Sequence, residues 1–122
     1  SLAQALFAPE AWYRAIYREE DLVGFVMLED ESLRSPAPAE PAVGVWRFMV
    51  DARFQGQGIG RAALQLVIEH VRSKDLFKTL QLSYVPGPGS PEPFYLSLGF
   101  RHTGQMDGQE VVLALPLVED AV

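Results

Sequence analysis

Residues 55–61, Gln-Gly-Gln-Gly-Ile-Gly-Arg, place three glycines between an apolar segment and an amphipathic helix. Glycine has no Cβ, so Gly56, Gly58 and Gly60 leave the backbone open to a ligand. The first N–H groups of a helix have no intrahelical acceptor, and the helix dipole is positive at that end. A phosphate can accept those hydrogen bonds, with Arg61 adding a full positive charge. These residues predict an anion-binding turn; a turn that only connects strand to helix is the alternative.

The residues after the glycines argue against two common phosphate-binding motifs. A P-loop places a lysine and a hydroxyl residue after its last glycine, whereas this chain has Ala62 and Ala63 there. A dinucleotide-binding fingerprint would place its third glycine at position 61, which is arginine, and the repeated strand and helix units of a full Rossmann sheet are missing. Hydrolysis of nucleoside triphosphates and binding of NAD are therefore disfavoured.

Length and composition favour a single globular domain. The chain has 122 residues, of which 48% are hydrophobic and 21% are charged, enough for one core of ordinary size. It has no cysteine, which excludes disulfides, thiolate metal sites and a cysteine acyl-enzyme. No apolar run is long enough for a membrane span, and the first residues do not follow the pattern of a secretion signal. We therefore expect a cytoplasmic protein with no membrane partner.

Acidic residues concentrate in the first third of the chain. Residues 1–40 carry eight acids against three bases, which accounts for −5 of the net charge of −6. The acids are Glu10, Glu19, Glu20, Asp21, Glu29, Asp30, Glu31 and Glu40. Such a field attracts cationic small molecules and repels nucleic acid, so we expect a small cationic substrate and no nucleic-acid partner. A solvated turn and loop are the simpler alternative.

Hydrophobic periodicity predicts alternating strands and helices. An antiparallel hairpin of residues 12–18 and 22–28 is followed by a proline-rich loop and a strand at 43–50. The helix predicted at 58–73 carries one apolar face, made by Leu64, Val67, Ile68 and Val71. The remaining predictions are a helix end at 1–7, a strand at 78–85, a short helix ending at 98–99 and a hairpin of 100–106 and 110–117. Residues 43–85 therefore form a parallel strand, helix, strand unit.

Two motifs resemble the GNAT superfamily of N-acetyltransferases. Gln55, Gly58 and Gly60 form a Q-x-x-G-x-G sequence similar to the loop that binds the pyrophosphate of acyl-CoA in that family. Residues 80–104, LQLSYVPGPGSPEPFYLSLGFRHTG, resemble the family's second conserved region, with Tyr95 four residues before a Gly-Phe pair. The resemblance covers nearly the whole chain and is closest to bacterial polyamine acetyltransferase-like members.

The resemblance implies an α/β (α+β) GNAT fold. Its central sheet is mixed and mostly antiparallel, with a parallel strand, helix, strand core and flanking helices. The chain begins within what resembles the family's second helix, so residues 1–122 are expected to form a single domain that lacks its first strand and helix. Residues 12–18 would then be an unpaired edge with large apolar side chains. By resemblance to the family we also expect a homodimer.

The resemblance further implies transfer of an acetyl group from acetyl-CoA to a primary amine by direct attack. The family holds pantetheine against a strand that corresponds to Phe48, Met49 and Val50. The residues matching the pyrophosphate loop are Gln55, Gly56, Gln57, Gly58, Ile59, Gly60 and Arg61. Tyr95 is the candidate acid, because a phenol with a pKa of about 10 is close to an alkyl thiol. Packing at a helix surface is the alternative for this tyrosine.

The general base stays unassigned. Some polyamine acetyltransferases carry an acid on the fourth strand, but the corresponding position here is Trp46. Glu29, Asp30 and Glu40 are close enough in the inferred order to act through water, although each is more simply an exposed loop acid. Arg47 is expected to pair with a neighbouring acid rather than to orient a substrate carboxylate.

Other departures from the family keep alternative functions open. Pro88 or Gly89 replaces its usual asparagine, which puts contacts to cofactor or substrate in doubt. A catalytically silent acyl-CoA-binding domain that acts as a sensor or scaffold is therefore one alternative. A protein or peptide N-acetyltransferase is another, since the sequence hardly specifies the acceptor. His70 and His102 lack metal-ligand spacing and are predicted to be ordinary surface residues, so no metal is expected.

Overall fold

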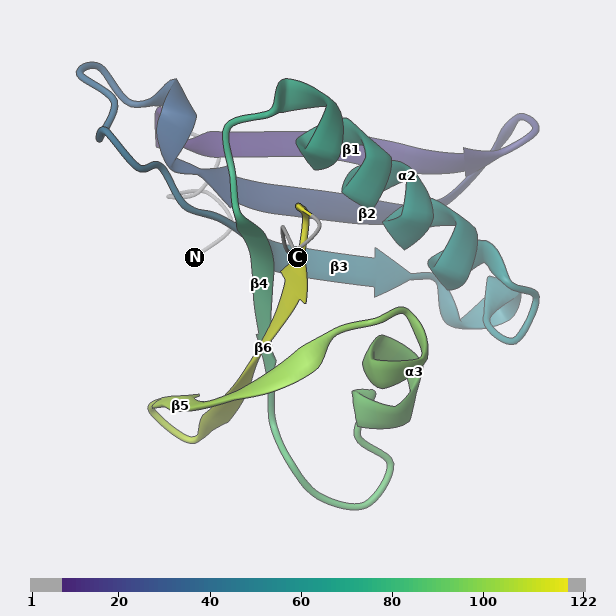
Figure 1. Cartoon of the computed structure of the whole chain (residues 1–122). Coiled ribbons are helices and arrows are strands. Elements are labelled where there is room, and N and C mark those ends of the chain that lie inside the picture. Colours follow the sequence, from purple (N-terminus) through teal and green to yellow (C-terminus); the bar gives the residue numbers. More distant parts are fainter. Residues whose placement is uncertain (1–7, 119–122) are drawn as a thin grey trace.

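Six strands form one sheet in the computed structural model, which describes residues 8–118. The strands are β1 (Ala11–Arg18), β2 (Asp21–Asp30), β3 (Val43–Val50), β4 (Thr79–Tyr84), β5 (Arg101–Asp107) and β6 (Glu110–Pro116). Helices α2 (Ile59–Lys74) and α3 (Glu92–Ser97) and the 3-10 turns Glu31–Leu33 and Ala52–Phe54 lie between them. The order across the sheet is β1-β2-β3-β4-β6-β5 (Figure 1). The helix end predicted at 1–7 lies outside the described residues.

Helix α2 packs one face of its amphipathic sequence on the sheet. The predicted apolar stripe is confirmed, because its four residues are buried and Ala63 joins them. The helix begins after Gly58 and ends at Asp75, where a left-handed residue with φ of 54° reverses the chain. Strand residues such as Leu80, Leu82 and Leu113 complete the core beneath it.

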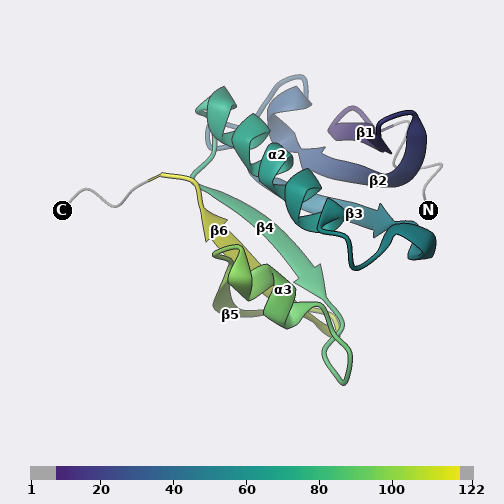
Figure 2. The ribbon, with the colours of Figure 1, turned by 90° about the vertical axis from the view of Figure 1, so that its right-hand side faces the viewer.

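Both helices cover the same face of the sheet. Arg61 at the start of α2 donates a hydrogen bond to the hydroxyl of Ser97 at the end of α3, so the two helices are neighbours. Figure 2 shows α2 running beside β3 and α3 lying beside β4 and β6. The opposite face of the sheet is therefore free of these helices.

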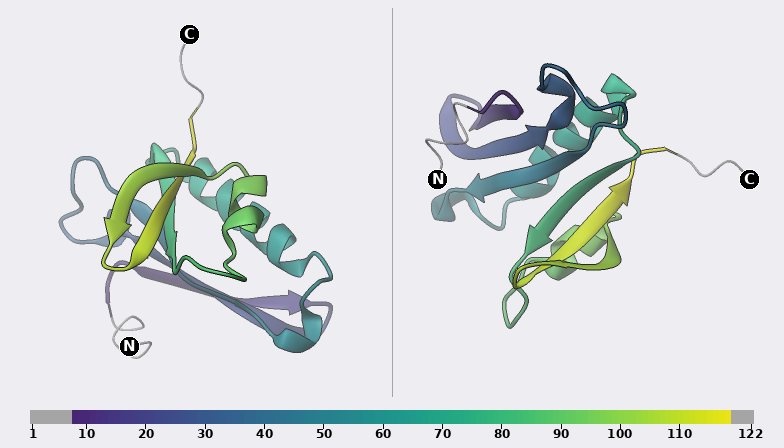
Figure 3. Two further views of the ribbon diagram at one scale, coloured as in Figure 1. Left: turned by 90° about the horizontal axis from the view of Figure 1, so that it is seen from below. Right: turned by 90° about the vertical axis from the view of Figure 1, so that its left-hand side faces the viewer.

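The sheet opens into a split between β3 and β4. These strands are parallel neighbours that pair at two positions, Val43 with Leu80 and Gly44 with Gln81. Beyond Gly44 they diverge, as the right-hand view of Figure 3 also shows. A crossover through α2 joins the two strands, as parallel neighbours require. The sheet thus consists of a β1-β2-β3 half and a β4-β6-β5 half that meet at one end.

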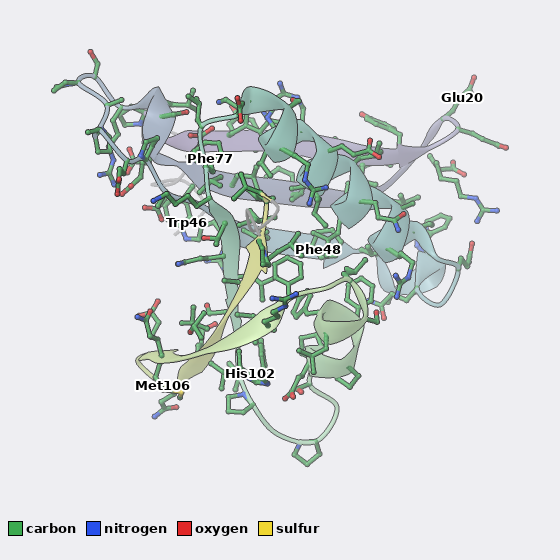
Figure 4. The ribbon with its side chains drawn as sticks, viewed as in Figure 1. Glu20, Trp46, Phe48, Phe77, His102 and Met106 are labelled. Atoms are coloured by element: carbon green, nitrogen blue, oxygen red, sulfur yellow. The ribbon has the colours of Figure 1, made fainter. Side chains whose placement is uncertain are left out.

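The hairpin of β1 and β2 places two of the acidic residues in a turn, as the simpler alternative expects. Glu19 and Glu20 form the turn between β1 and β2, at the tip of the hairpin (Figure 4).

Within residues 8–118, β1 pairs only with β2, which leaves its other edge open. Tyr13 is 43% exposed and Tyr17 is 62% exposed. The predicted edge strand is present, and the predicted homodimer stays a prediction.

His70 does not behave as an ordinary surface residue. Its ring stacks on that of Trp12, with the ring centroids 4.5 Å apart and the planes 21° from parallel. This contact fixes α2 against β1, and burial lowers the pKa of His70 below its ordinary value. The surface prediction is therefore wrong for this histidine, because the β1-β2 hairpin folds back under the helix.

Candidate active site

The glycine turn has the geometry that an anion-binding loop needs. Gly56 and Gly58 have φ of 77° and 80°, where a side chain would strain the backbone. A Cβ built at either glycine would meet no atom within 4 Å, so open space lies beside the backbone. Gly58 caps α2 without a side-chain hydrogen bond, which leaves the first helical N–H groups uncapped by any side chain. A phosphate can therefore approach the turn without displacing protein groups.

The glycine turn borders a pocket of about 680 Å³ on the helix face, which we call the glycine-loop pocket. Its lining comes from β3, the loop, α2 and α3: Phe48, Val50, Phe54, Gln55, Gly56, Gly58, Ile59, Gly60, Arg61, Pro91, Phe94 and Tyr95. Gly60 lies where these elements converge, because a Cβ there would be in ordinary van der Waals contact, at 3.7 Å, with the rings of both Phe48 and Phe94. Most of the predicted cofactor residues and the predicted acid thus share one cavity.

Two predicted cofactor residues do not line the pocket, and a third is already engaged. Met49 is 62% exposed and points away from it, as alternation along β3 requires. The side chain of Gln57 accepts a hydrogen bond from Arg18. Arg61 lines the pocket, but its guanidinium binds Ser97 and lies 6.0 Å from the Phe94 ring. Their roles toward a cofactor stay predictions, resting on backbone groups for Met49 and Gln57.

Tyr95 is held in an aromatic cluster at the inner edge of α3. Its ring centroid lies 5.5 Å from that of Phe94, 6.0 Å from that of Phe100 and 6.4 Å from that of Tyr84. Burial raises the pKa of Tyr95 above its ordinary value, so the phenol keeps its proton at neutral pH. Within residues 8–118 its hydroxyl has no hydrogen-bond partner. A protonated, uncommitted phenol is what a general acid in this pocket needs.

A hydrogen-bonded clamp, which the sequence did not suggest, fixes α3. Tyr84 at the end of β4 donates to Oε2 of Glu92 over 2.7 Å, and Nε2 of His102 on β5 lies 3.2 Å from Oε1. These two hydrogen bonds lower the pKa of Glu92, the one from Tyr84 more strongly. His102 is exposed as predicted, but it takes part in this clamp. Because Glu92 is one helical turn before Tyr95, the clamp sets where the phenol stands.

A second cavity, of about 430 Å³, opens on the opposite face of the split, and we call it the polar pocket. Its lining is Glu29, Gly44, Val45, Trp46, Arg47, Gln81, Leu82, Ser83, Asp107, Glu110 and Val112. Alternation along β4 explains the two faces, because Leu82 and Tyr84 are buried under the helices while Gln81 and Ser83 point the other way. The two pockets therefore approach the same split from opposite sides.

Trp46 enters the polar pocket through a β-bulge. Strand β2 pairs Leu28 with Val45 and Met27 with Arg47, so Trp46 has no opposite residue. Its side chain is 40% exposed at the pocket wall (Figure 4). The bulge turns a large apolar surface toward the cavity at the position where sequence comparison suggested an acid.

The three acids considered as bases from the sequence differ in burial, in ion pairing and in whether they line a pocket. Glu29 lines the polar pocket, with its side chain 45% exposed and 3.7 Å from Arg34. Asp30 is 1% exposed and binds Nζ of Lys74 at 2.8 Å, so its prediction as an exposed acid is wrong. Glu40 is exposed, 4.0 Å from Lys78, and lines neither pocket.

Arg47 was predicted to pair with a neighbouring acid, and this is wrong for the residues that the structure describes. None of the ion pairs within residues 8–118 includes its guanidinium. Arg47 instead contributes to the wall of the polar pocket. In the register of β2 and β3, Arg47 stands opposite Met27, and Gly44 rather than Arg47 stands opposite Glu29.

Between residues 8 and 118, no three His, Asp or Glu side chains are grouped so as to hold a metal ion. None of the helices in the same range is both long and apolar enough to cross a bilayer.

The glycine turn, the split sheet and the tyrosine at its edge invite comparison with known families. A sequence model described as the acetyltransferase (GNAT) family matches residues 2–100. The chain belongs to this family. Membership confirms the resemblance inferred from the two motifs, and the sheet confirms the predicted α/β (α+β) GNAT fold.

One curated GNAT relative is spermine/spermidine N(1)-acetyltransferase of Bacillus subtilis (strain 168), 30% identical over 100 residues. The alignment covers 80% of this chain and 66% of the relative, so the chain spans just under two thirds of that protein's length. An identity of 30% supports the family and not a particular acceptor amine.

Two solved GNAT structures establish the same fold. The ribosomal-protein-S18-alanine N-acetyltransferase from Escherichia coli superposes with a TM-score of 0.75 at 20% identity, over 98% of this chain and 77% of that one. The PaiA N-acetyltransferase from Thermoplasma acidophilum, in complex with coenzyme A, gives a TM-score of 0.71 at 16% identity, over 88% of this chain and 61% of that one. The similarity in both cases is one of fold.

Proposed function

We propose that this protein transfers an acetyl group from acetyl-CoA to a primary amine of a small cationic acceptor such as a polyamine. One observation carries the proposal: two pockets of different character reach the same split from opposite faces of the sheet. The glycine-loop pocket suits an acyl-CoA, and the polar pocket suits a charged amine. Such an arrangement brings donor and acceptor together without a covalent enzyme intermediate.

The donor side rests on backbone groups. Gly56 and Gly58 expose N–H groups at the start of α2, where the pyrophosphate of acetyl-CoA would accept them. Phe48 and Val50 on β3 give the pantetheine an apolar wall and a strand edge that lacks pairing to β4. Coenzyme A in the PaiA structure supports the same donor here.

The acceptor side carries an excess of negative charge. Glu29, Asp107 and Glu110 face the polar pocket against one guanidinium, that of Arg47. Carboxylates attract an ammonium group, and the Trp46 ring offers both apolar contact and cation–π attraction to an alkylammonium. The curated relative named for spermine and spermidine supports this acceptor class.

Tyr95 supplies the acid for the leaving group. As the acceptor nitrogen attacks the acetyl carbon, the C–S bond breaks and the departing thiolate takes the phenolic proton. The raised pKa of Tyr95 keeps that proton in place until the sulfur becomes basic. The clamp on Glu92 fixes the helix that presents it.

Release of free thiol from acetyl-CoA tests the proposal, with spermidine, spermine, an alkylamine and a peptide N-terminus as acceptors. Turnover should be fastest with the polyamines. Tyr95→Phe should slow kcat about 10-fold to 1000-fold while the Kd of acetyl-CoA stays unchanged. Tyr13→Phe, which alters an exposed tyrosine on β1, is the matched control. Faster turnover of the peptide would instead indicate a protein N-acetyltransferase.

A catalytically silent acyl-CoA-binding domain is the second candidate function. It is favoured by Trp46, which occupies the position where an acid was sought. Binding of acetyl-CoA without turnover of any amine in the panel would support this sensor or scaffold role and overturn the enzymatic proposal.

A further inference from the structure

We infer that Glu110 is the general base of the transfer and that the hydroxyl of Ser83 orients it. The inference rests on the proposed function, since it names the group that makes the acceptor amine nucleophilic. Neither residue belongs to the glycine loop or to the motif around Tyr95.

The register between β4 and β6 brings these two residues together. Ser83 pairs with Val112, and Glu110 lies two residues earlier on β6, so both side chains point to the face of the polar pocket. The hydroxyl of Ser83 donates to Oε1 of Glu110 over 3.2 Å. Within residues 8–118, Oε2 has no hydrogen-bond partner. One oxygen is thus fixed and the other is free to receive a proton.

The surroundings distinguish Glu110 from the other acids near the split. Glu29 is 3.7 Å from Arg34, and Asp30 is 2.8 Å from Lys74, so a cation already stabilises each carboxylate. Among the described residues, Glu110 has no cation within 4.0 Å and is half-buried. A carboxylate that no cation engages has an oxygen free to meet the acceptor's ammonium group.

Among the described residues, Asp107 is the other acid of the polar pocket without an ion-pair partner, and no hydrogen bond fixes its carboxylate. It stands opposite Glu110 at the turn of the β5-β6 hairpin and is exposed. No side chain in residues 8–118 donates a hydrogen bond to its carboxylate. We therefore place Asp107 in attraction of the cationic acceptor and Glu110 in proton transfer.

Proton transfer by Glu110 completes a balanced reaction. Its carboxylate takes a proton from the acceptor's ammonium group and passes it to solvent. The nitrogen lone pair then forms the C–N bond, and the C–S electron pair leaves with the sulfur, which takes the proton of Tyr95. Glu110 takes the remaining excess N–H proton, and water returns it to Tyr95. The products are the acetylated amine, free CoA thiol and one proton in solvent.

Steady-state kinetics with acetyl-CoA and spermidine, from about pH 6.5 to about pH 9.5, test this role. Glu110→Gln should lower kcat/KM about 100-fold at neutral pH. The gap to the wild type should narrow as pH rises, because more of the amine is then neutral without help. Ser83→Ala should give a smaller loss with the same pH trend, while Glu40→Gln, an exposed acid outside both pockets, should match the wild type.

Four results would overturn the inference. The first is that kcat/KM of Glu110→Gln stays within about 2-fold of the wild type. The second is that its loss of kcat/KM is equal at every pH, which would indicate a binding or structural role. The third is that Asp107→Asn, rather than Glu110→Gln, shows the pH-dependent loss of kcat/KM. Thermal unfolding of each variant separates misfolding from a lost base. Turnover of no amine by the wild type would overturn the proposed function and this inference together, whereas the first three results overturn only the inference.

Discussion

The glycine-loop pocket and the polar pocket adjoin the same split, but they are built in different ways. The first is made largely by consecutive residues, with backbone groups and glycines presented by one strand, turn and helix. The second gathers side chains from β2, β3, β4, β5 and β6, which are far apart in the chain. A site built from local backbone is specified by a short motif, whereas a site built from side chains depends on the register of the whole sheet.

This difference suits the two substrates of the proposed reaction. Every donor carries the same pyrophosphate and pantetheine, which backbone groups bind whatever the side chains are. Acceptors differ in charge and length, and only side chains can distinguish them. Variants of the two pockets should therefore fail in separate ways, one in donor binding and the other in acceptor binding.

The largest effect is expected from Gly58→Val. A β-branched residue at φ of 80° is strained, and its side chain would fill the open space beside the backbone N–H groups. The Kd of acetyl-CoA, measured by calorimetry, should rise about 100-fold. Gly104→Val places the same side chain at the same φ of 80° in β5, outside both pockets. An equal loss of acetyl-CoA affinity in that control would contradict phosphate binding by the glycine turn.

An intermediate effect is expected when the charge of the polar pocket is reversed. The double variant Glu29→Lys, Asp107→Lys should raise the KM for spermidine about 10-fold, because ammonium groups would meet cations there. The KM for acetyl-CoA should change little. Glu19→Lys, Glu20→Lys makes the same change of charge at the tip of the first hairpin. If that control raised the spermidine KM as much, a general acidic field rather than the polar pocket would attract the substrate.

The smallest effect is expected from the clamp on α3, and it depends on pH. The folded state lowers the pKa of Glu92 through hydrogen bonds from Tyr84 and His102. The stabilisation is therefore present above the ordinary glutamate pKa and is lost as pH falls through the lowered folded value. Glu92→Gln should lower the Tm by a few degrees at neutral pH and by less in acid. Glu69→Gln on the exposed face of α2 should leave the Tm unchanged at both pH values.

The fold and the donor side were predictable because their signals are local. The buried stripe of α2 follows from helical spacing, and Gly58 lies within a motif read from consecutive residues. Tyr95 was identified by its distance from a Gly-Phe pair, and the structure places it in the same pocket as the glycines. Its role as an acid, like those of the cofactor residues, stays a prediction until kinetics test it.

The polar pocket was not predictable, since pairing between strands decides which side chains meet. Glu110 meets Ser83 only through the register of β6 on β4. Trp46 reaches the pocket wall through a β-bulge, which the residue types of β3 do not predict. The sequence predicts Asp30 to be a loop acid because a strand end and a loop look alike in sequence, yet Lys74 at the end of α2 binds it. Each error concerns a partner distant in the chain.

The two backbone pairings that join β3 to β4 have a consequence for how the proposed enzyme would diversify. Within residues 8–118 the strands of the two halves pair only at Val43 and Gly44 with Leu80 and Gln81, while the contacts of Arg61 with Ser97 and of Gly60 with Phe94 join α3 to the glycine turn. The β5-β6 hairpin makes neither of these contacts, so we expect substitutions and insertions there to change the wall of the polar pocket without displacing the glycine turn. In the proposed enzyme, acceptor choice would then change through this one hairpin while the donor site stays the same.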